Sequence, residues 1–289
     1  MVGIIGVICV FVTVFGGYLL AGGHLDIILH SLPYEMLMIC GAAIGAFIIS
    51  NNASAIKHTM KDVGKVFKGP QWGASDYRDL LCLLYELLRI AKTSPVALDP
   101  HIEDPQESSV FQKYPRILKD KESVALITDT LRSAMMNYDD PHQVEEVLTK
   151  RIEATHHHKL HSTHALQTIA DGLPALGIVA AVLGVIKTMG SIDKPPEVLG
   201  KLIGGALVGT FLGVFLAYGF VGPFSSKVKS VIDEDANFHI LIKEVLVAHL
   251  HAHPPKISVE VGRQNIPAHL RPDFSAVEEA LKSTGKIAA

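Results

Sequence analysis

The stretch from Leu202 to Ser226 reads LIGGALVGTFLGVFLAYGFVGPFSS and contains no formally charged side chain. A helix needs about 20 mainly apolar residues to cross the hydrocarbon core of a bilayer, and a charge at its centre costs about 2.5–3.5 kcal/mol. A stretch of this length and composition is therefore long enough to span a membrane. The whole chain agrees with that interpretation, because 48% of its 289 residues are hydrophobic, only 19% are charged and the mean hydropathy is +0.31.

Three further runs have the same character: Met1 to Gly23, Met36 to Ile56 and Ala165 to Ile186. The last of them carries one acid, Asp171, near its start. The first run lacks a basic amino-terminal region and a persuasive cleavage site, so we interpret it as a mature helix and not as a signal peptide. The predicted transmembrane helices lie at about residues 1–22, 35–55, 167–188 and 201–224.

Lysines indicate the orientation of these spans, because cytoplasmic flanks collect Lys and Arg. The loop from Gly23 to Glu35 contains neither residue, whereas lysines follow the second and fourth runs, at Lys57, Lys61, Lys65, Lys68, Lys227 and Lys229. Both termini are therefore predicted to lie in the cytoplasm, with two short external loops.

The polar segments complete an all-α fold, a polytopic membrane protein with a helical cytoplasmic domain. We divide the chain into a transmembrane hairpin (1–56), a cytoplasmic helical domain (57–164), a second hairpin (165–226) and a cytoplasmic C-terminal segment (227–289). Leucines at helical spacing predict an amphipathic helix over Asp76–Lys92, followed by a loop through Pro105. Further helices are expected at Glu122–Met136, from His142 into the third span, and at Phe274–Lys282, and an extended segment at Lys256–Arg263.

The sequence argues against several classes of function. A net charge of −3 offers no basic surface for nucleic acid. The three cysteines are widely spaced, which argues against disulfides or a thiolate metal site. No nucleotide-binding loop, nucleophile elbow or zinc-protease motif occurs, so we predict no enzyme and no cofactor. A histidine cluster invites a metal-transport hypothesis, but a solvated helix beside the membrane is the preferred interpretation of His156, His157, His158, His161 and His164.

Small residues and prolines mark the third and fourth runs. Small residues four positions apart let helix backbones touch in lipid, within one chain or between neighbouring subunits, and both possibilities stay open for Gly177, Gly205, Gly209 and Gly213. Pro174 and Pro223 each remove a helical hydrogen bond and leave the carbonyls of Ala170 and Gly219 free for water, an ion or a hinge.

The predicted spans hold no ionisable group at mid-membrane, where ion carriers need one. Asp171 lies about two turns from the end of its helix, and an interfacial role is at least as plausible for it as a relay. If the chain conducts ions, we expect another chain to supply the carboxylate.

Two motifs resemble the MotA family of flagellar stator subunits. One is Ala206 to Phe215, ALVGTFLGVF, followed by Pro223; the other is Asp171 to Val185, DGLPALGIVAAVLGV. The similarity also includes Ile102–Pro105 and Tyr114–Leu118, and it covers nearly the whole chain.

The resemblance implies a ring of five such subunits around a dimer of a MotB-like protein in the lipid of the bacterial inner membrane. The partner would bring the missing aspartate, and the channel lining implied for this chain is Pro174, Ala181, Thr210, Tyr218 and Pro223. Sodium-driven relatives carry a threonine where this sequence has Ala181, so the resemblance favours protons as the transported ion.

The family contacts the rotor protein FliG through charged residues, which we match to Lys92 and Asp99, with Arg89 beside them. Lys92 cannot make the two-pronged contact of an arginine, and an exposed charged loop is the simpler alternative. The nearest rival function is a TolQ- or ExbB-like proton-channel subunit that energises envelope transport, but those relatives usually have three spans. A passive membrane scaffold is the rival from another class.

Overall fold

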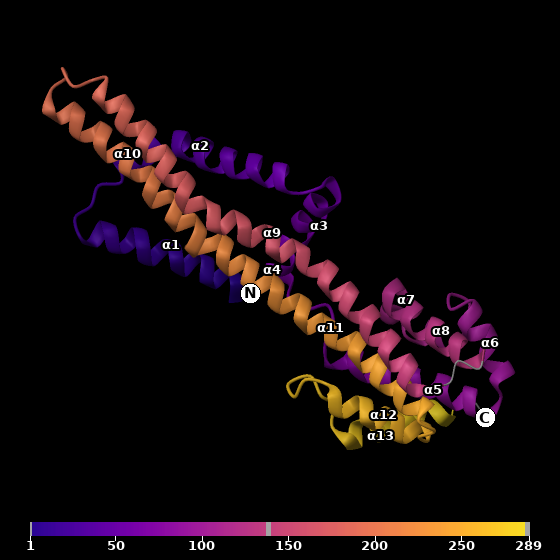
Figure 1. Cartoon of the computed structure of the whole chain (residues 1–289). Helices are drawn as coiled ribbons and strands as arrows, with labels where there is room; N and C mark the ends of the chain where they lie inside the picture. The colour runs from indigo at the N-terminus through magenta and orange to yellow at the C-terminus, as the bar shows by residue number, and fades with distance from the viewer. Residues whose placement is uncertain (1, 137–139, 287–289) are drawn as a thin grey trace. The chain divides into compact units, whose positions relative to one another are not determined.

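The computed structural model describes residues 2–136 and 140–286, which form helices and loops without any strand. Residue 1 of the predicted first span, residues 137–139 of the predicted cytoplasmic domain and residues 287–289 of the C-terminal segment lie outside the described residues. The chain divides into two compact units (Figure 1). Unit 1 comprises Met1–Gly69 and Lys159–Val231, and unit 2 comprises Pro70–His158 and Ile232–Ala289.

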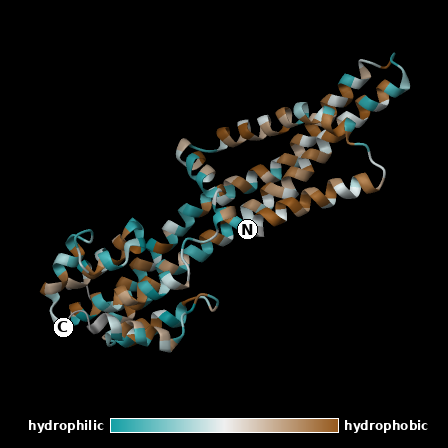
Figure 2. Ribbon diagram, turned by 180° about the vertical axis from the view of Figure 1, so that it is seen from behind, coloured by the Kyte–Doolittle hydropathy of each residue, from teal (hydrophilic) through white to brown (hydrophobic). Residues whose placement is uncertain are grey.

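Unit 1 is built on apolar helices. Its elements are α1 (Val2–Leu20), α2 (Asp26–Ser50), α3 (Ala53–Val63), α4 (Lys65–Lys68), the second part of α9 (Pro141–Met189), α10 (Pro196–Leu216), the π-helical turn η2 (Ala217–Val221) and the start of α11 (Gly222–Leu250). Among the described residues, four helices are long and apolar enough to cross a membrane: α1, α2, α9, and α10 with its continuation. Hydrophobic residues cover most of α1, α2 and the adjoining parts of α9 and α10 (Figure 2).

The α9–α10 pair is the centre of unit 1, and α1 and α2 flank it (Figure 1). One set of buried side chains joins α2, α9, α10 and η2: Ile39, Ala43, Leu173, Ala180, Leu212 and Ala217. α1 is attached by aromatic rings, since Phe11 and Phe15 pack edge-on against Phe215 with ring centroids 5.7 and 5.4 Å apart. The outer faces of α1 and α2 remain exposed and apolar, as expected for helices that face lipid or neighbouring subunits.

The second span differs from its predicted bounds. We placed it at about residues 35–55, with Glu35 in the external loop, but α2 begins at Asp26 and ends at Ser50. Glu35 therefore lies inside a membrane-spanning helix and not at the edge of the external loop, so the spans, which we expected to hold no ionisable group at mid-membrane, do contain a carboxylate. A prediction from charge-free runs places the boundary of a span at the first acidic residue, here Glu35. The helix nevertheless continues, because the Glu35 side chain is only 5% exposed and lies against other helices.

Unit 2 is a helical domain with its own core. It contains α5 (Ala74–Thr93), α6 (Pro95–Glu103), η1 (Phe111–Lys113), α7 (Pro115–Lys119), α8 (Lys121–Met135), the first part of α9, the rest of α11, α12 (Pro255–Asn265) and α13 (Phe274–Lys286). The predicted leucine stripe of α5 is buried, with Leu80, Leu84 and Leu87 fully inaccessible to solvent. Leu83 is also fully buried, so α5 is covered on more than the predicted face.

The C-terminal helices supply that extra cover. We treated residues 227–289 as a separate segment, but Ile232–Ala289 belongs to the same compact unit as Pro70–His158. Trp72 stacks on Phe238 of α11 with ring centroids 3.9 Å apart. On α12, a Cβ atom at Gly262 would lie 2.2 Å from a methyl group of Val245, so only glycine lets α12 approach α11 this closely.

Two local expectations in unit 2 are corrected. The segment Lys256–Arg263 is helical and not extended, because Pro255 occupies the first turn of α12, where its missing N–H costs nothing. The expected loop after Thr93 contains α6, whose first turn holds Pro95 and whose N-cap hydroxyl on Ser94 accepts from the Ala97 N–H at 3.4 Å. The residues that end α5 therefore also begin α6, since Ser94 is the C-cap of one helix and the N-cap of the other.

Candidate ion-conducting site

The seam between α9 and α10 brings two helix backbones into contact. A Cβ atom on Gly213 would lie 2.6 Å from the Leu173 carbonyl oxygen and 2.9 Å from the Gly177 Cα. A Cβ atom on Gly177 would lie 2.8 Å from the Gly209 carbonyl oxygen. These distances leave no room for a side chain, so the glycines serve packing within this chain. Gly205 belongs to another contact, since a Cβ atom there would lie 2.7 Å from Ser31 Oγ of α2.

Three of the predicted lining residues lie along this seam, and each is half-buried. Pro174 directly follows Leu173, whose carbonyl faces Gly213. Ala181 is near Gly209, because a Cβ atom on that glycine would lie 3.2 Å from the Ala181 nitrogen. Thr210 is the next residue of α10. The three residues therefore lie within about two turns of one packed helix pair.

The other two predicted lining residues lie at the end of α10. Pro223 and Tyr218 are both exposed, and the Tyr218 side chain is 73% accessible. Between α10 and Pro223 the chain forms the π turn η2, in which the Gly222 N–H donates to the Ala217 carbonyl. A proline ring collides with the carbonyl four residues earlier and cannot donate to it, and a wider turn accommodates both effects. π turns of this kind are often found at functional sites.

The two prolines are not neighbours within the chain. Pro223 is close to Ser225, whose hydroxyl donates to the Thr163 carbonyl at 3.0 Å, whereas Pro174 is close to the contact between Leu173 and Gly213. The two contacts are ten residues apart along α9, and twelve residues apart from α10 to α11, or about 15–18 Å at 1.5 Å per residue. The predicted lining therefore forms a strip along the helix pair and not a single ring.

Two acidic side chains of unit 1, Asp171 and Glu35, lie in different environments. Asp171 is exposed on α9 and accepts a hydrogen bond from Gln167 Nε2 at 2.8 Å, which is an ordinary surface pair one turn apart. Glu35 is buried beside Gly209 and was missed by counting charge-free runs. The available signal was the spacing of Ser31 and Glu35, which places two polar groups on one face of a helix that faces the glycine ladder.

The candidate rotor contact lies where α5 ends and α6 begins. Lys92 is exposed in the last turn of α5, Asp99 is exposed in α6, and Arg89 is half-buried. Between the two charges, Val96 is 80% exposed. Burial, and to a lesser degree the charge of Lys92, lowers the pKa of the nearby His249 below its ordinary value. The region offers opposite charges on either side of an apolar side chain, a pattern suited to contact with another protein.

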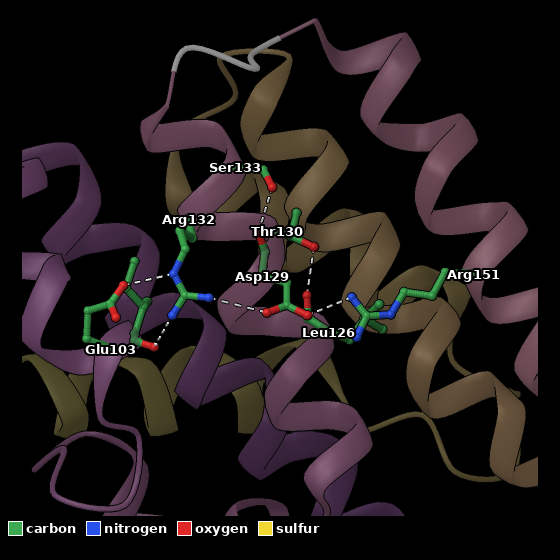
Figure 3. A network of polar contacts seen from close by, with 8 residues as sticks. Glu103, Leu126, Asp129, Thr130, Arg132, Ser133 and Arg151 are labelled. Carbon is green, nitrogen blue, oxygen red and sulfur yellow. Dashed lines mark hydrogen bonds and ion pairs between the residues drawn. The ribbon is translucent and has the colours of Figure 1, made fainter.

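A charged network holds α6 in place (Figure 3). Arg132 of α8 donates from Nε to Glu103 of α6 at 2.8 Å and lies 3.4 Å from Asp129. Arg151 of α9 donates to the same Asp129 at 2.9 Å. The hydrogen bond to Glu103 raises the pKa of Arg132, which therefore stays charged. The network fastens α6, and with it Asp99, to α8 and α9.

The histidine cluster is spread along α9. His156 Nε2 lies 3.2 Å from a carboxylate oxygen of Asp233. In the described part of the chain, no three His, Cys, Asp or Glu side chains are arranged to hold a metal ion.

Together, the four spans and the backbone-to-backbone seam define a polytopic membrane protein with a large helical polar domain. Two family profiles match it: "Motility protein A N-terminal" over residues 4–95 and "MotA/TolQ/ExbB proton channel family" over residues 119–238. Motility protein A of Salmonella typhimurium is 38% identical over 281 residues, which is 97% of this chain and 95% of that protein. The chain belongs to the MotA family.

Solved structures share its fold. A structure described as C. jejuni MotAB matches with a TM-score of 0.73 at 19% identity, covering 92% of this chain and 95% of the other. A structure described as the flagellar MotAB stator complex from Bacillus subtilis matches with a TM-score of 0.66 at 22% identity, covering 96% of this chain and 98% of the other.

Proposed function

We propose that this chain is a subunit of a flagellar stator which, with a MotB-like partner, forms a proton channel and converts proton flow into torque on the rotor protein FliG. The observation that carries the proposal is the 38% identity to motility protein A along almost the full length of both chains. The fold shared with a flagellar MotAB stator complex supports it.

In the proposed mechanism the MotB-like partner contributes an aspartate beside the α9–α10 seam. Between Gly172 and Ile186 on α9, and between Leu202 and Ser226 on α10 and its continuation, this chain has no carboxylate. Protons enter from the external side, protonate the partner's aspartate next to Pro174 and Thr210, and leave toward the cytoplasm past Pro223. The protonated acid donates a hydrogen bond to a free carbonyl of the seam, whereas the carboxylate is repelled by it, and the ring steps around its partner as the proton is taken up and released.

Protons are the proposed ion because of Ala181. Sodium binding needs several hard oxygen ligands, whereas a proton needs only an acid and water. The methyl group of Ala181 adds no oxygen at the position where a threonine hydroxyl would.

The proposed assembly is a homo-oligomer, five subunits around a partner dimer, in the bacterial inner membrane with both termini inside. The exposed apolar faces of α1 and α2 supply surface for neighbouring subunits and lipid. The absence of Lys and Arg between Gly23 and Glu35 supports an external position for that loop. The TolQ- or ExbB-like alternative is less favoured, because four described helices are able to span the membrane and the N-terminal motility profile matches residues 4–95.

The test is complementation of a strain that lacks its own stator, with this chain expressed beside its partner. We expect swimming to be restored, and to stop when the proton gradient is collapsed but not when only the sodium gradient is. Swimming speed and the amount of chain in the membrane are the measurements. A strain that swims equally well without the gene, or that stops only on loss of the sodium gradient, contradicts the proposal.

Charge reversal tests the proposed rotor contact. We expect Lys92→Glu and Asp99→Lys each to lower swimming speed by roughly two- to fivefold, the effect of losing about 0.5–1 kcal/mol of charge complementarity. Reversing the facing charge on FliG should restore part of the speed. Lys121→Glu, on an exposed lysine elsewhere in unit 2, serves as the matched control. Equal speeds for all three variants would remove Lys92 and Asp99 from the contact.

A further inference from the structure

α2 presents two polar side chains to α10, one helical turn apart. Ser31 Oγ lies 2.7 Å from the position a Cβ atom would occupy on Gly205, and Glu35 Oε2 lies 2.6 Å from the corresponding position on Gly209. The carboxylate of Glu35 thus occupies space that exists only because residue 209 has no side chain. Its side chain is 5% exposed.

Glu35 has no neutralising partner in its surroundings. Its Oε2 atom is buried and accepts no hydrogen bond from any group in the described part of the chain. The facing segments Leu173–Ile186 of α9 and Ile203–Leu216 of α10 contain no Asp, Glu, Lys, Arg or His. On α2 itself the nearest titratable side chains are the exposed Tyr34 and His30 and the half-buried Cys40. Burying a lone charge is costly, so a structural role alone would favour a neutral residue here.

The carboxylate also lies beside the candidate conduction seam. The same Cβ position on Gly209 lies 3.2 Å from the Ala181 nitrogen, and Thr210 is the next residue. Glu35 is nine residues into α2, or about 13–14 Å along the helix from its external start. An acid at this depth lies between the external solution and the seam.

We propose that Glu35 is a proton-transfer residue of this chain, which takes up protons from the external side and releases them toward the partner's carboxylate. One carboxylate oxygen accepts the proton, the neutral acid gives it up to the next acceptor, and the carboxylate is regenerated without any net change in Glu35. The inference deepens the proposed stator function and rests on it. The facing segments of α9 and α10 carry no Lys, Arg or His, so no fixed positive charge there opposes protonation of Glu35.

The alternative is that Glu35 only fills space between α2 and α10. Two substitutions keep its volume but remove the exchangeable proton: Glu35→Gln retains the polar end and Glu35→Met gives an apolar one. Glu35→Asp retains the acid on a shorter stem. A space-filling role predicts that Gln or Met is tolerated and that Asp, which leaves a gap, is not. A proton-transfer role predicts the reverse order.

The experiment uses the full chain with its partner in the stator-deficient strain, with Asp26→Asn, an exposed acid on the same helix, as the matched control. Swimming speed is measured over a range of external pH, and membrane abundance and co-purification with the partner are measured in parallel. We expect Gln and Met to lower speed about tenfold or more without loss of assembly, Asp to retain part of it, and Asp26→Asn to match the wild type.

A second readout does not depend on motility. Infrared difference spectra of the purified complex between high and low pH contain C=O bands from all titrating acids, the partner's aspartate included, so the spectrum of Glu35→Gln is subtracted from that of the wild type. We expect the subtraction to leave one protonated-carboxyl component, which shifts in Glu35→Asp. Wild-type speed in either the Gln or the Met variant overturns the inference, and so do wild-type and Glu35→Gln spectra that are identical in the carboxyl C=O region. Failure of the stator proposal itself looks different, because then the wild-type chain does not restore swimming while the infrared band still reports on Glu35.

Discussion

Gly213→Val is expected to abolish accumulation of the folded chain in the membrane. A Cβ atom at residue 213 would lie 2.6 Å from the Leu173 carbonyl oxygen, 2.9 Å from the Gly177 Cα and 3.2 Å from the Gly177 nitrogen. All three are backbone atoms, so no side chain can rotate away and α9 must separate from α10. Overpacking a closely packed interior costs about 1–3 kcal/mol and sometimes more, and valine adds two further methyl groups to the clash.

Membrane abundance and thermal unfolding in detergent measure this effect, with Gly213→Ala as the milder variant. Gly172→Ala, on α9 but with no described atom within 4 Å of its Cβ position, is the matched control and should accumulate normally. If Gly213→Ala and Gly172→Ala accumulate and unfold alike, the close contact at the seam is not needed for assembly.

Pro174→Ala is expected to abolish swimming while the chain still assembles. Proline in a helix interior costs about 3 kcal/mol relative to alanine, so the substitution should strengthen α9 locally and not weaken it. Alanine restores an N–H that donates to the Ala170 carbonyl, and the seam then loses the free acceptor and the local flexibility that we assign to ion transfer. Loss of function together with gain of helix stability distinguishes this residue from a packing residue.

The measurements are swimming speed, chain abundance and co-purification with the MotB-like partner. Pro196→Ala is the control, because Pro196 occupies the first turn of α10, where no helical hydrogen bond is missing. A Pro174→Ala strain that swims like the wild type would show that the free carbonyl at Ala170 is dispensable, and a strain that lacks the protein in its membrane would assign Pro174 to folding.

Local physical chemistry made much of the fold predictable. The cost of a charge in hydrocarbon applies to each window of about 20 residues separately, so the four apolar runs stand out without knowledge of their neighbours. The same holds for the amphipathic leucines of α5 and for the long helix that starts near His142 and continues into the third span as α9. Pro174, Ala181 and Thr210 were located by their motifs, and the structure places them on one seam.

Other features depend on contacts between distant segments, and tertiary structure alone decided them. The sequence left open whether the glycine ladder packs within the chain or between subunits; the approach of Gly177 to Gly213 brings two helices of the same chain together. The segment 232–289 is part of the helical domain because Phe238 stacks on Trp72, which lies more than 160 residues earlier in the chain. From the hydropathy of its neighbours alone, Glu35 is predicted to be an acidic residue of the external loop. It becomes a buried carboxylate only because Gly209, on another helix, has no side chain to exclude it.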